Sequence, residues 1–513
     1  MSAIEAVIEI GSTGIRLLVA EIFDSLSDEV QKWTVLDKSE LPVLLGRDVF
    51  TTGAISRDTM VQCLHIISRF KEQLTTWNIP QDSISVIATS ALRIAKNRDA
   101  VLDRIKVKTG FTVRVVDGIE QNKLTYLAVS QCFKHQSVSL EGTNSIILEI
   151  GGGATDIMLI KEGDMAGVHT LPLGTVIIEQ KLNSMGSKQD TKRFLQEFIR
   201  VTRKALDNEM RFTNIQQFIA LGQEAQNAAD ICGTPISPNL KCISRNNFDT
   251  LVEEIQNYTI EECVARFRIS YYEASALHIS LLAYQTFLQF TQVTEILVPY
   301  TNTREGLLLN SIKKPDKALQ KKFKSQVIAS AWNLAKKYKV DEHHAECVRS
   351  LSLKLFDSLK KELGLEEKTR ILLELAAILH DIGMFIRADN HHIHSAYIIN
   401  NSDIFGLSRE QIDIIAQIAY NHKGNHSPQE LPQFSSQPRK NRIAVLKLTA
   451  ILRIADAFDR GHTQQITDFT IDLHDETLVI RCNKTQDLSL EKKALAEKSN
   501  IFEDVFGYRV ILG

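Results

Sequence analysis

Two short glycine-rich segments of the sequence resemble each other closely enough to predict a duplicated fold. The segments are VIEIGSTGIRLLVAEI (7–22) and ILEIGGGATDIMLIKEG (147–163). Each has an apolar run, a Glu-Ile-Gly step, a few small residues and a second apolar run, a pattern typical of a hairpin. A unit repeated at long range predicts two similar subdomains that face each other. The matched positions are Glu9 with Glu149, Ile10 with Ile150 and Gly11 with Gly151, at one constant offset.

The residues of these turns leave two interpretations open. Glycines let backbone N–H groups approach an anion closely, and successive N–H groups form an anion-binding concavity. Two such turns opposed across a cleft could hold a phosphate, while Glu9, Glu149 and Asp156 supply the hard oxygen ligands that Mg²⁺ prefers. Alternatively, both segments are only hairpin turns of a duplicated scaffold.

The rest of the sequence alternates between strands and helices before its character changes. Strand-like runs at 83–93, 111–118 and 294–300 with intervening helices favour a sheet covered on both faces. After a charged, proline-containing joint at 313–324, the pattern is helical to about residue 458 and then returns to alternation. We therefore expect two α/β subdomains, a helical domain and a small α+β cap, at 1–120, 121–312, 313–462 and 463–513.

Composition restricts the partners and the compartment. The net charge is -2, from 60 Lys and Arg against 62 Asp and Glu, which argues against a generic nucleic-acid binder but permits a local basic channel. The seven cysteines are an odd number without a Cys-x-x-Cys pair, which indicates free thiols in a reducing compartment. Since neither a signal peptide nor a long apolar segment is evident, we expect a cytoplasmic protein without a membrane partner.

Five segments in one order resemble the exopolyphosphatase/guanosine pentaphosphate phosphohydrolase (Ppx/GppA) family. They are the two turns, ATSALRIAKN (88–97), VVDGIEQNKLTYLAV (115–129) and TREGLLL (303–309). The resemblance implies a duplicated actin-like, ribonuclease-H-like core followed by a helical HD-type domain. It also implies Mg²⁺-dependent hydrolysis of the terminal phosphoanhydride of inorganic polyphosphate or of the guanosine polyphosphate pppGpp. By analogy with the family, we expect a homodimer formed through the helical domains.

The resemblance also implies which residues hold phosphate and Mg²⁺. The phosphate-binding set is Gly11, Ser12, Thr13, Arg93, Gly151, Gly152 and Gly153, and the Mg²⁺ set is Glu9, Glu149 and Asp156. The family's loops usually read D-x-G-S-N-S and D-I-G-G-G-S-T-E, whereas this chain has EIGSTG and EIGGGATD. The exchanged carboxylates keep their charge but change their reach, and Ala154 lacks the hydroxyl donor of the family's Ser.

The most consequential departure lies in the family motif S-G-x-E-E-A, which reads DGIEQN here. Glu120 keeps the first glutamate, but Gln121 replaces the second, which the family uses as the general base. Because an amide cannot accept a proton at neutral pH, we expect Glu120 to activate the water, with Glu149 as the third catalytic residue. The alternative is a sensor that binds polyphosphate or an alarmone without cleaving it. An actin-like kinase is a weaker option, since ALGQEAQNAA (220–229) keeps little beyond Gly222 of the second-half loop.

Histidines are concentrated in the helical region, where nine of the 14 lie between His343 and His462. The set of His344, His380, Asp381 and Asp456 is similar to the ligand set of HD-domain metallophosphohydrolases. Mixed imidazole and carboxylate ligands suit Mn²⁺, Fe²⁺ or Zn²⁺. Further candidates, at positions where binuclear HD proteins place second-metal ligands, are His391, His394 and His422. The alternatives are a site that has decayed to packing and a nucleotide phosphohydrolase with its own activity.

Overall fold

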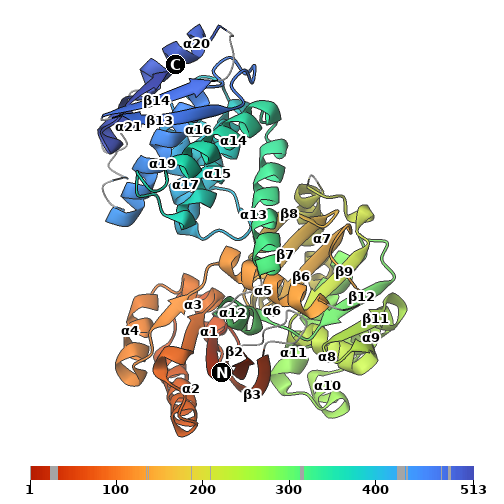
Figure 1. Ribbon diagram of the computed structural model, residues 1–513. Coiled ribbons are helices and arrows are strands. Elements are labelled where there is room, and N and C mark those ends of the chain that lie inside the picture. Colours follow the sequence, from red (N-terminus) through yellow and green to blue (C-terminus); the bar gives the residue numbers. More distant parts are fainter. Residues whose placement is uncertain are drawn as a thin grey trace. The chain divides into compact units, whose positions relative to one another are not determined.

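The computed structural model divides the chain into two compact units after Val327 (Figure 1). The helix α13 (Lys317–Lys337) runs through this division, so the joint expected at 313–324 is helical from Lys317 onward, and its first residues lie outside the described part. The described residues are 2–23, 33–134, 136, 138–185, 188–207, 209–311, 317–423, 434, 437–474, 476–482 and 487–513.

The first sheet of the N-terminal unit has the strand order β3-β2-β1-β4-β5. Its strands are β1 (Ser2–Ile10), β2 (Gly14–Phe23), β3 (Trp33–Pro42), β4 (Ile84–Ala88) and β5 (Val113–Val115). The first three strands are antiparallel neighbours, and β1 pairs in parallel with β4. Its helices are α1 (Leu45–Thr52), α2 (Arg57–Thr76), α3 (Ser90–Ile94), α4 (Arg98–Thr109) and α5 (Gly118–Phe133).

The second sheet repeats this path within a larger, seven-stranded order, β10-β11-β12-β9-β6-β7-β8. Its strands are β6 (Ser145–Ile150), β7 (Thr155–Lys161), β8 (Asp164–Leu171), β9 (Gln217–Leu221), β10 (Thr234–Ser237), β11 (Leu240–Ser244) and β12 (Glu295–Pro299). The hairpin of β6 and β7 and the parallel neighbour β9 correspond to β1, β2 and β4. The predicted hairpins and their duplication are therefore present. The helices are α6 (Thr175–Met185), α7 (Lys188–Leu206), α8 (Gln223–Cys232), α9 (Arg245–Asn257), α10 (Ile260–Phe267), α11 (Tyr271–Leu288) and α12 (Thr303–Ser311).

Strand alternation decides which way the key glutamate of the first sheet points. In β1, Ala6, Ile8 and Ile10 pack into one apolar cluster, and Val7 packs into the cluster on the other face. Since successive residues of a strand point to opposite faces, Glu9 lies on the same face as Val7. That face packs against α5 and α12 through Leu124 and Leu307. Glu9 is therefore directed toward the elements that complete the site.

The C-terminal unit consists of helices followed by a small three-stranded sheet. The helices before the sheet are α14 (Glu342–Leu359), α15 (Arg370–Leu379), α16 (His391–Asn400), α17 (Arg409–Asn421) and α19 (Arg439–Ala457). The elements of the cap are β13 (Phe469–His474), β14 (Thr477–Cys482), α20 (Ser489–Lys498), α21 (Asn500–Phe506) and β15 (Arg509–Leu512). The helical run and its return to α+β structure follow the sequence pattern. Among the described residues, no helix is long and apolar enough to cross a membrane.

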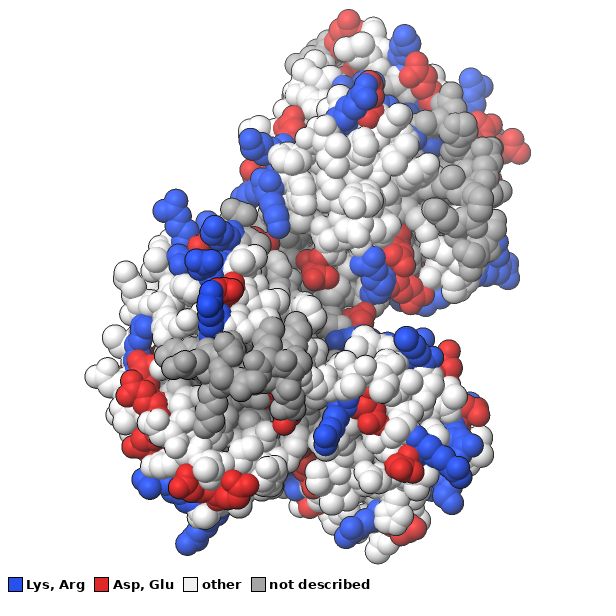
Figure 2. Space-filling view, turned by 180° about the vertical axis from the view of Figure 1, so that it is seen from behind, with Lys and Arg blue, Asp and Glu red and all other residues white. Residues whose placement is uncertain are grey.

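Charged side chains of both signs are mixed on the face of the molecule shown in Figure 2. Lys and Arg alternate there with Asp and Glu and do not gather into one basic patch.

Candidate functional site

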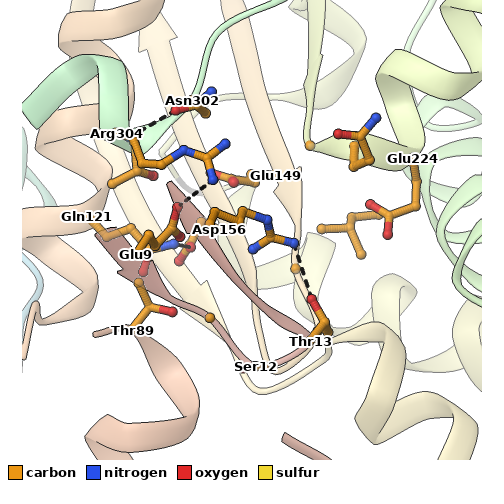
Figure 3. Close-up of a pocket in the computed structure, with 18 of the residues that line it drawn as sticks. Glu9, Ser12, Thr13, Thr89, Gln121, Glu149, Asp156, Glu224, Asn302 and Arg304 are labelled. Carbon is orange, nitrogen blue, oxygen red and sulfur yellow. Dashed lines mark hydrogen bonds and ion pairs between the residues drawn. The ribbon is translucent and has the colours of Figure 1, made fainter. Parts of the chain in front are cut away.

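A cavity of about 340 Å³ opens in the N-terminal unit beside the two glycine-rich turns (Figure 3). The two turns, the strand ends before and after them, α5, and the segments around Gly222 and Arg304 all contribute to its lining. Of the predicted site residues, those that line it are Glu9, Gly11, Ser12, Thr13, Arg93, Gln121, Glu149, Gly151, Gly152 and Asp156. The fold thus brings together residues from both halves of the repeat.

Both turns are closed by the same hydrogen bond at matched positions. The Gly11 amide donates to the Gly14 carbonyl at 2.9 Å, and the Gly151 amide donates to the Ala154 carbonyl at 2.8 Å. The amides of Gly11 and Gly151, which were expected to face a phosphate, are therefore used within the turns. Both residues line the cavity, and phosphate binding by Gly11 and Gly151 stays a prediction.

Neighbouring amides hold the carbonyls of the turns. Gly46 and Val43 donate to the carbonyls of Ser12 and Thr13 at 2.7 and 3.2 Å. In the second turn, Thr175 and Val176 donate to the carbonyls of Gly151 and Gly152 at 3.0 and 2.9 Å. A peptide whose carbonyl is fixed in this way has its N–H directed the opposite way. Among these peptides, the N–H groups of Thr13 and Gly152 belong to residues that line the cavity, and Ser12 and Gly153 donate no backbone hydrogen bond within the described turns.

The glycines of the second turn are required by close packing. A Cβ atom at Gly152 would lie 2.6 Å from Cγ2 of Thr13 and 3.1 Å from Cβ of Ser12. A Cβ atom at Gly153 would lie 2.2 Å from the Phe50 ring. The backbone of the second turn therefore packs directly against the side chains of Ser12, Thr13 and Phe50, which leaves no room for a side chain at Gly152 or Gly153.

Three side chains of the first half, those of Ser12, Ser90 and Arg93, add donors near the turns. The hydroxyls of Ser12 and Ser90 are 2.8 Å apart. Arg93 lines the cavity and donates Nη1 to the Val116 carbonyl at 2.9 Å. Because a guanidinium carries five N–H donors in a fixed fork, one such bond orients Arg93 and leaves other donors for an anion.

Opposite charges surround Glu9. Its carboxylate lies 3.5 Å from Nη1 of the buried Arg304. Figure 3 marks this ion pair with a dashed line. Its partner across the hairpin is Arg16, which binds Glu40 at 2.8 Å and Thr13 Oγ1 at 3.3 Å. Burial opposes the charge of Arg16, but Glu9 and Glu40 outweigh it and raise the pKa. Glu9 is thus neutralised by two arginines and is poorly suited to the cation site that the sequence suggested for it.

In the second half of the repeat, the position that matches Arg16 carries a negative charge, since it is Asp156. Glu149 pairs across its hairpin with Asp156, where Glu9 pairs with Arg16. Burial, and then the neighbouring charges of Asp156 and Glu9, raise the pKa of Glu149 to about 8. Thr170 Oγ1 donates to Asp156 at 2.6 Å, and Thr125 Oγ1 lies 3.5 Å from Glu149. Two adjacent carboxylates inside a cavity favour a shared proton or a hard cation such as Mg²⁺ between them.

Gln121, and not Glu120, belongs to the cavity. Gln121 Nε2 donates to Asp156 Oδ2 at 3.3 Å, whereas Glu120 forms an ion pair with Arg114 and does not line the cavity. Asp117 accepts from the Glu120 amide at 2.7 Å and so sets the start of α5. Consecutive residues on a helix point in directions about 100° apart, so only one of the two can face the turns. The expectation that Glu120 contacts the reacting water does not agree with this arrangement.

Three contributors to the cavity were missed by the sequence reasoning. Arg16 and Arg304 balance Glu9, and Glu224 lies on the far side of the cavity at the start of α8. Gly222, just before this helix, has a φ of 102°, which favours glycine. The sequence offered one usable signal, because Arg16 occupies the repeat position of Asp156.

A second group of polar side chains converges inside the C-terminal unit. Two sets of candidate metal ligands share Asp381, namely His344 with His380 and His391 with His422. Asp456 completes the first set, with Oδ1 at 3.6 Å from His344 Nε2. The sequence-predicted His344, His380, Asp381, Asp456, His391 and His422 are thus brought together. His394 belongs to neither set among the described residues.

Without a bound cation, two histidines of this group titrate in opposite directions. Burial lowers the pKa of His344, but Asp456 and Asp459 outweigh it and raise the pKa to about 9. Burial lowers the pKa of His380 to about 4. Lys498 contacts Asp456 and overcomes the effect of burial, so that the pKa of this carboxyl lies well below its ordinary value.

Comparison with known proteins gives two family matches and several relatives. Residues 25–314 match the Ppx/GppA phosphatase family, and residues 328–503 match domain III of Ppx/GppA phosphatases. A guanosine-5'-triphosphate,3'-diphosphate pyrophosphatase of Pseudoalteromonas atlantica is 24% identical over 88% of this chain and 86% of its own length. The protein of the same name from Photobacterium profundum is 23% identical over 94% and 92%. An exopolyphosphatase structure from Cytophaga hutchinsonii has a TM-score of 0.53 at 19% identity, covering 61% of this chain and 99% of that one, and shares the fold.

Proposed function

Because the chain belongs to the Ppx/GppA phosphatase family, we propose that it is a hydrolase that releases the terminal phosphate of inorganic polyphosphate, of pppGpp, or of both. One observation carries this proposal. Two matched turns from the two halves of the repeat line one cavity, beside the carboxylates of Glu149 and Asp156. Anion donors and a cation site side by side are what phosphoryl transfer requires.

Backbone and guanidinium donors hold the terminal phosphate in this proposal. The amides of Ser12, Thr13, Gly152 and Gly153 surround its oxygens, and Arg93 adds a charged donor that Val116 holds in place. Since these donors are fixed before the substrate arrives, they stabilise charge developing on the phosphoryl group without having to reorganise.

Glu149 and Asp156 hold Mg²⁺ in this proposal, without Glu9. The two residues are directly paired across the hairpin, so their side chains lie on one face of the sheet, and carboxylate oxygens are the hard ligands that Mg²⁺ prefers. Glu9 is excluded because Arg304 and Arg16 already compensate its charge. The ion would supply neutralisation of the charge on the transferred phosphoryl group.

The direct test is phosphate release by the purified protein. We expect release from polyphosphate, pppGpp or both in the presence of Mg²⁺, and none after a chelator has removed the ion. Comparing the two substrates at equal concentration would identify the preferred one. If neither substrate releases phosphate at any Mg²⁺ concentration, the proposal of hydrolysis fails.

Replacing Glu120 with Gln should change the turnover number by no more than about fivefold, since a partly exposed ion pair contributes about 1 kcal/mol at most. The reason is that Glu120 binds Arg114 and does not line the cavity. Steady-state kinetics at saturating substrate and Mg²⁺ would measure the effect. A loss of about 100-fold or more, within the range expected for a general base, would return that role to Glu120.

Binding of Mg²⁺ should become tighter as the pH rises toward 8. The pKa of Glu149 is raised to about 8, so at pH 6 the carboxyl is protonated and the incoming ion must displace the proton. Below this pKa, the apparent affinity should rise about tenfold for each pH unit and then level off above it. Calorimetry in buffers of different ionisation enthalpy would detect the released proton. An affinity independent of pH between 6 and 8 would contradict this expectation.

A sensor that binds phosphate chains without cleaving them is a second candidate function, because Gln121 stands where the family has its base. The same turns and Arg93 would provide the binding in either case. Polyphosphate binding with negligible phosphate release would favour the sensor.

The C-terminal unit supports a further candidate, an HD-type metal-dependent nucleotide phosphohydrolase. The convergence of His344, His380 and Asp381 favours it. A double His380→Ala, Asp381→Ala variant would lose nucleotide hydrolysis but keep polyphosphate binding if the reaction occurs there. Equal activity in the variant and the parent protein would exclude this candidate.

A homodimer formed through the helical region is also part of the proposal. Large apolar side chains are exposed there on the segment that leads into α16 and on that helix itself, namely Met384, Phe385, Ile386, Ile393 and Tyr397. Exposed apolar groups of this kind often mark a protein interface. The molar mass in solution would test the proposal, and a monomer at micromolar concentration would contradict it.

A further inference from the structure

Charge is distributed unevenly around the N-terminal cavity. The cations that line it are Arg16, Lys38, Arg93 and Arg304. The side of the cavity along α8, here called the α8 arm, is formed by Gln223, Glu224, Gln226, Asp230 and Tyr300. These five residues include two carboxylates and neither Lys nor Arg. Figure 3 shows Glu224 on the side of the cavity away from Gln121 and Glu9. The α8 arm is therefore a poor match for a second, negatively charged phosphate group.

The two carboxylates of the α8 arm differ in their availability to a ligand. Asp230 is bound by Lys241 Nζ at 2.6 Å and accepts a hydrogen bond from the Tyr300 hydroxyl at 2.5 Å. Within the described residues, Glu224 forms no ion pair and no hydrogen bond with another side chain. Burial raises the pKa of Glu224, and its own amide and Arg16 oppose this shift. Glu224 is thus the acceptor of the α8 arm that a ligand can reach.

Glu224 also occupies the position where a helix would otherwise attract an anion. It lies in the first turn of α8, and Gly222, the residue before the helix, has no side chain to cap it. A Cβ atom at Gly222 would lie 3.7 Å from Glu224 Oε2, so the carboxylate lies beside the N-terminus of the helix. Helix N-termini stabilise negative charge and commonly bind phosphate. A phosphate brought to this N-terminus meets the like charge of Glu224.

A group that donates hydrogen bonds fits Glu224 better than an anion does. A carboxylate only accepts, and its two oxygens bind a planar group with two parallel N–H donors particularly well. Among the common nucleobases, guanine has such an edge, formed by N1–H and the 2-amino group. Inorganic polyphosphate offers anionic oxygens at the same place. The segment at 220–229 keeps little beyond Gly222 of the family's second-half loop, so Glu224 is a feature of this chain.

We propose that Glu224 is a specificity-determining residue that favours a guanine nucleotide over inorganic polyphosphate. Its carboxylate accepts from the N–H edge of the base and repels a further phosphate, while the phosphate chain lies on the side of the cavity that carries the cations. This assignment rests on the proposed hydrolase function and deepens it by choosing between its two substrates.

Three ligands with the same phosphate chain test this role. GTP has the complete guanine edge, ITP lacks only the 2-amino group, and inorganic tripolyphosphate has no nucleoside. Calorimetry on the full-length protein with Mg²⁺ would give the three affinities. We expect GTP to bind about tenfold more tightly than ITP, the usual effect of one hydrogen bond to a charged group, and tripolyphosphate to bind most weakly. Equal affinity of the parent protein for GTP and ITP would overturn the proposal without any variant.

The variant Glu224→Gln should change the affinities for two of these ligands in opposite directions. GTP should bind about 10–100-fold more weakly, because the charged acceptor is lost. Tripolyphosphate should bind about tenfold more tightly, because a like charge is removed. Damage to the fold would weaken both ligands together, so opposite changes identify a role in specificity. Weakening of both ligands to the same extent, or no change in either, would contradict the assignment.

Two further variants complete the experiment. Glu261→Gln makes the same change in the first turn of α10, on an exposed residue outside the cavity, and should leave all three affinities within about twofold of the parent values. Glu224→Asp keeps the charge but shortens its reach, so it should lose the preference for GTP over ITP and still bind tripolyphosphate weakly. A preserved preference in Glu224→Asp would refute bidentate recognition of the base.

Binding and hydrolysis are measured separately, which keeps the two proposals distinguishable. If the protein binds GTP over ITP but releases no phosphate from pppGpp or polyphosphate, hydrolysis fails and the role of Glu224 in binding stands. If phosphate is released and Glu224→Gln leaves the affinities for GTP, ITP and tripolyphosphate unchanged, hydrolysis stands and the role of Glu224 fails.

Discussion

Replacement of Glu149 by Gln should lower phosphate release by about 1,000-fold or more, because charge stabilisation by a fixed group or metal commonly contributes that much. Glu149 and Asp156 are paired across the hairpin, whereas Glu9 is paired with Arg16 and contacts Arg304. Glutamine keeps the size of the side chain but removes the charge that holds Mg²⁺. Turnover should be measured at Mg²⁺ concentrations up to saturation of the parent enzyme.

Two controls separate this loss from unfolding. Glu120→Gln removes a carboxylate just outside the cavity and should retain nearly full activity. The pKa of Glu149 is raised from 4.5 to about 8, so metal-free parent protein loses stability as the pH rises through this range, whereas the Gln variant does not. In chelator above pH 8, Glu149→Gln should therefore melt at a higher temperature than the parent. Full activity of this variant would exclude Glu149 as a metal ligand.

Replacement of Gln121 by Glu should raise the turnover number by about 100-fold at saturating Mg²⁺, the lower end of what a positioned general base contributes. Gln121 already lines the cavity and contacts Asp156 at 3.3 Å, so a carboxylate in its place would be beside the reacting water in the proposed complex. The gain depends on the metal, because a third carboxylate next to Asp156 and Glu149 adds repulsion when no cation is bound.

The matched variant is Gln121→Ala, which loses the contact to Asp156 without gaining a base and should show no increase. A large gain for Gln121→Glu would mean that the native chain is a weakened hydrolase or a sensor. Turnover equal to that of the parent would mean that the base lies elsewhere and would contradict the role given to this position. The two variants together distinguish the added base from a simple change in packing.

The sequence predicted the local elements and their repetition well. The apolar runs around EIGSTG and EIGGGATD form the hairpins β1–β2 and β6–β7, because their strand periodicity and glycine turns are local properties. The predicted histidine and aspartate ligands also converge, since His380 and Asp381 follow directly from one helix and the others face them from neighbouring helices. His394 belongs to neither ligand set among the described residues. It lies on α16 only three residues after His391, so its position in the sequence did not exclude it as a ligand.

The roles within the cavity were harder to predict. Glu9 and Glu149 are identical in the repeat, yet Arg16 stands opposite Glu9 where Asp156 stands opposite Glu149. Arg304 reaches Glu9 from a segment almost 300 residues away in the chain. Glu120 and Gln121 are neighbours on α5 that point in different directions, and the start of the helix at Asp117 decides which of them faces the cavity.

By itself, the sequence determined the duplicated α/β core and the hairpin turns. It also determined the types of residue that line the N-terminal cavity and that form the group of histidines and aspartates in the C-terminal unit. These follow from periodicity and turn chemistry, which act over a few residues. The tertiary structure alone decided which amides are used within the turns, which glutamate has arginine neighbours and which nitrogens of the histidines face one another. Charge compensation and hydrogen-bond direction depend on distances of about 3–4 Å between segments far apart in the chain, and only folding fixes those distances.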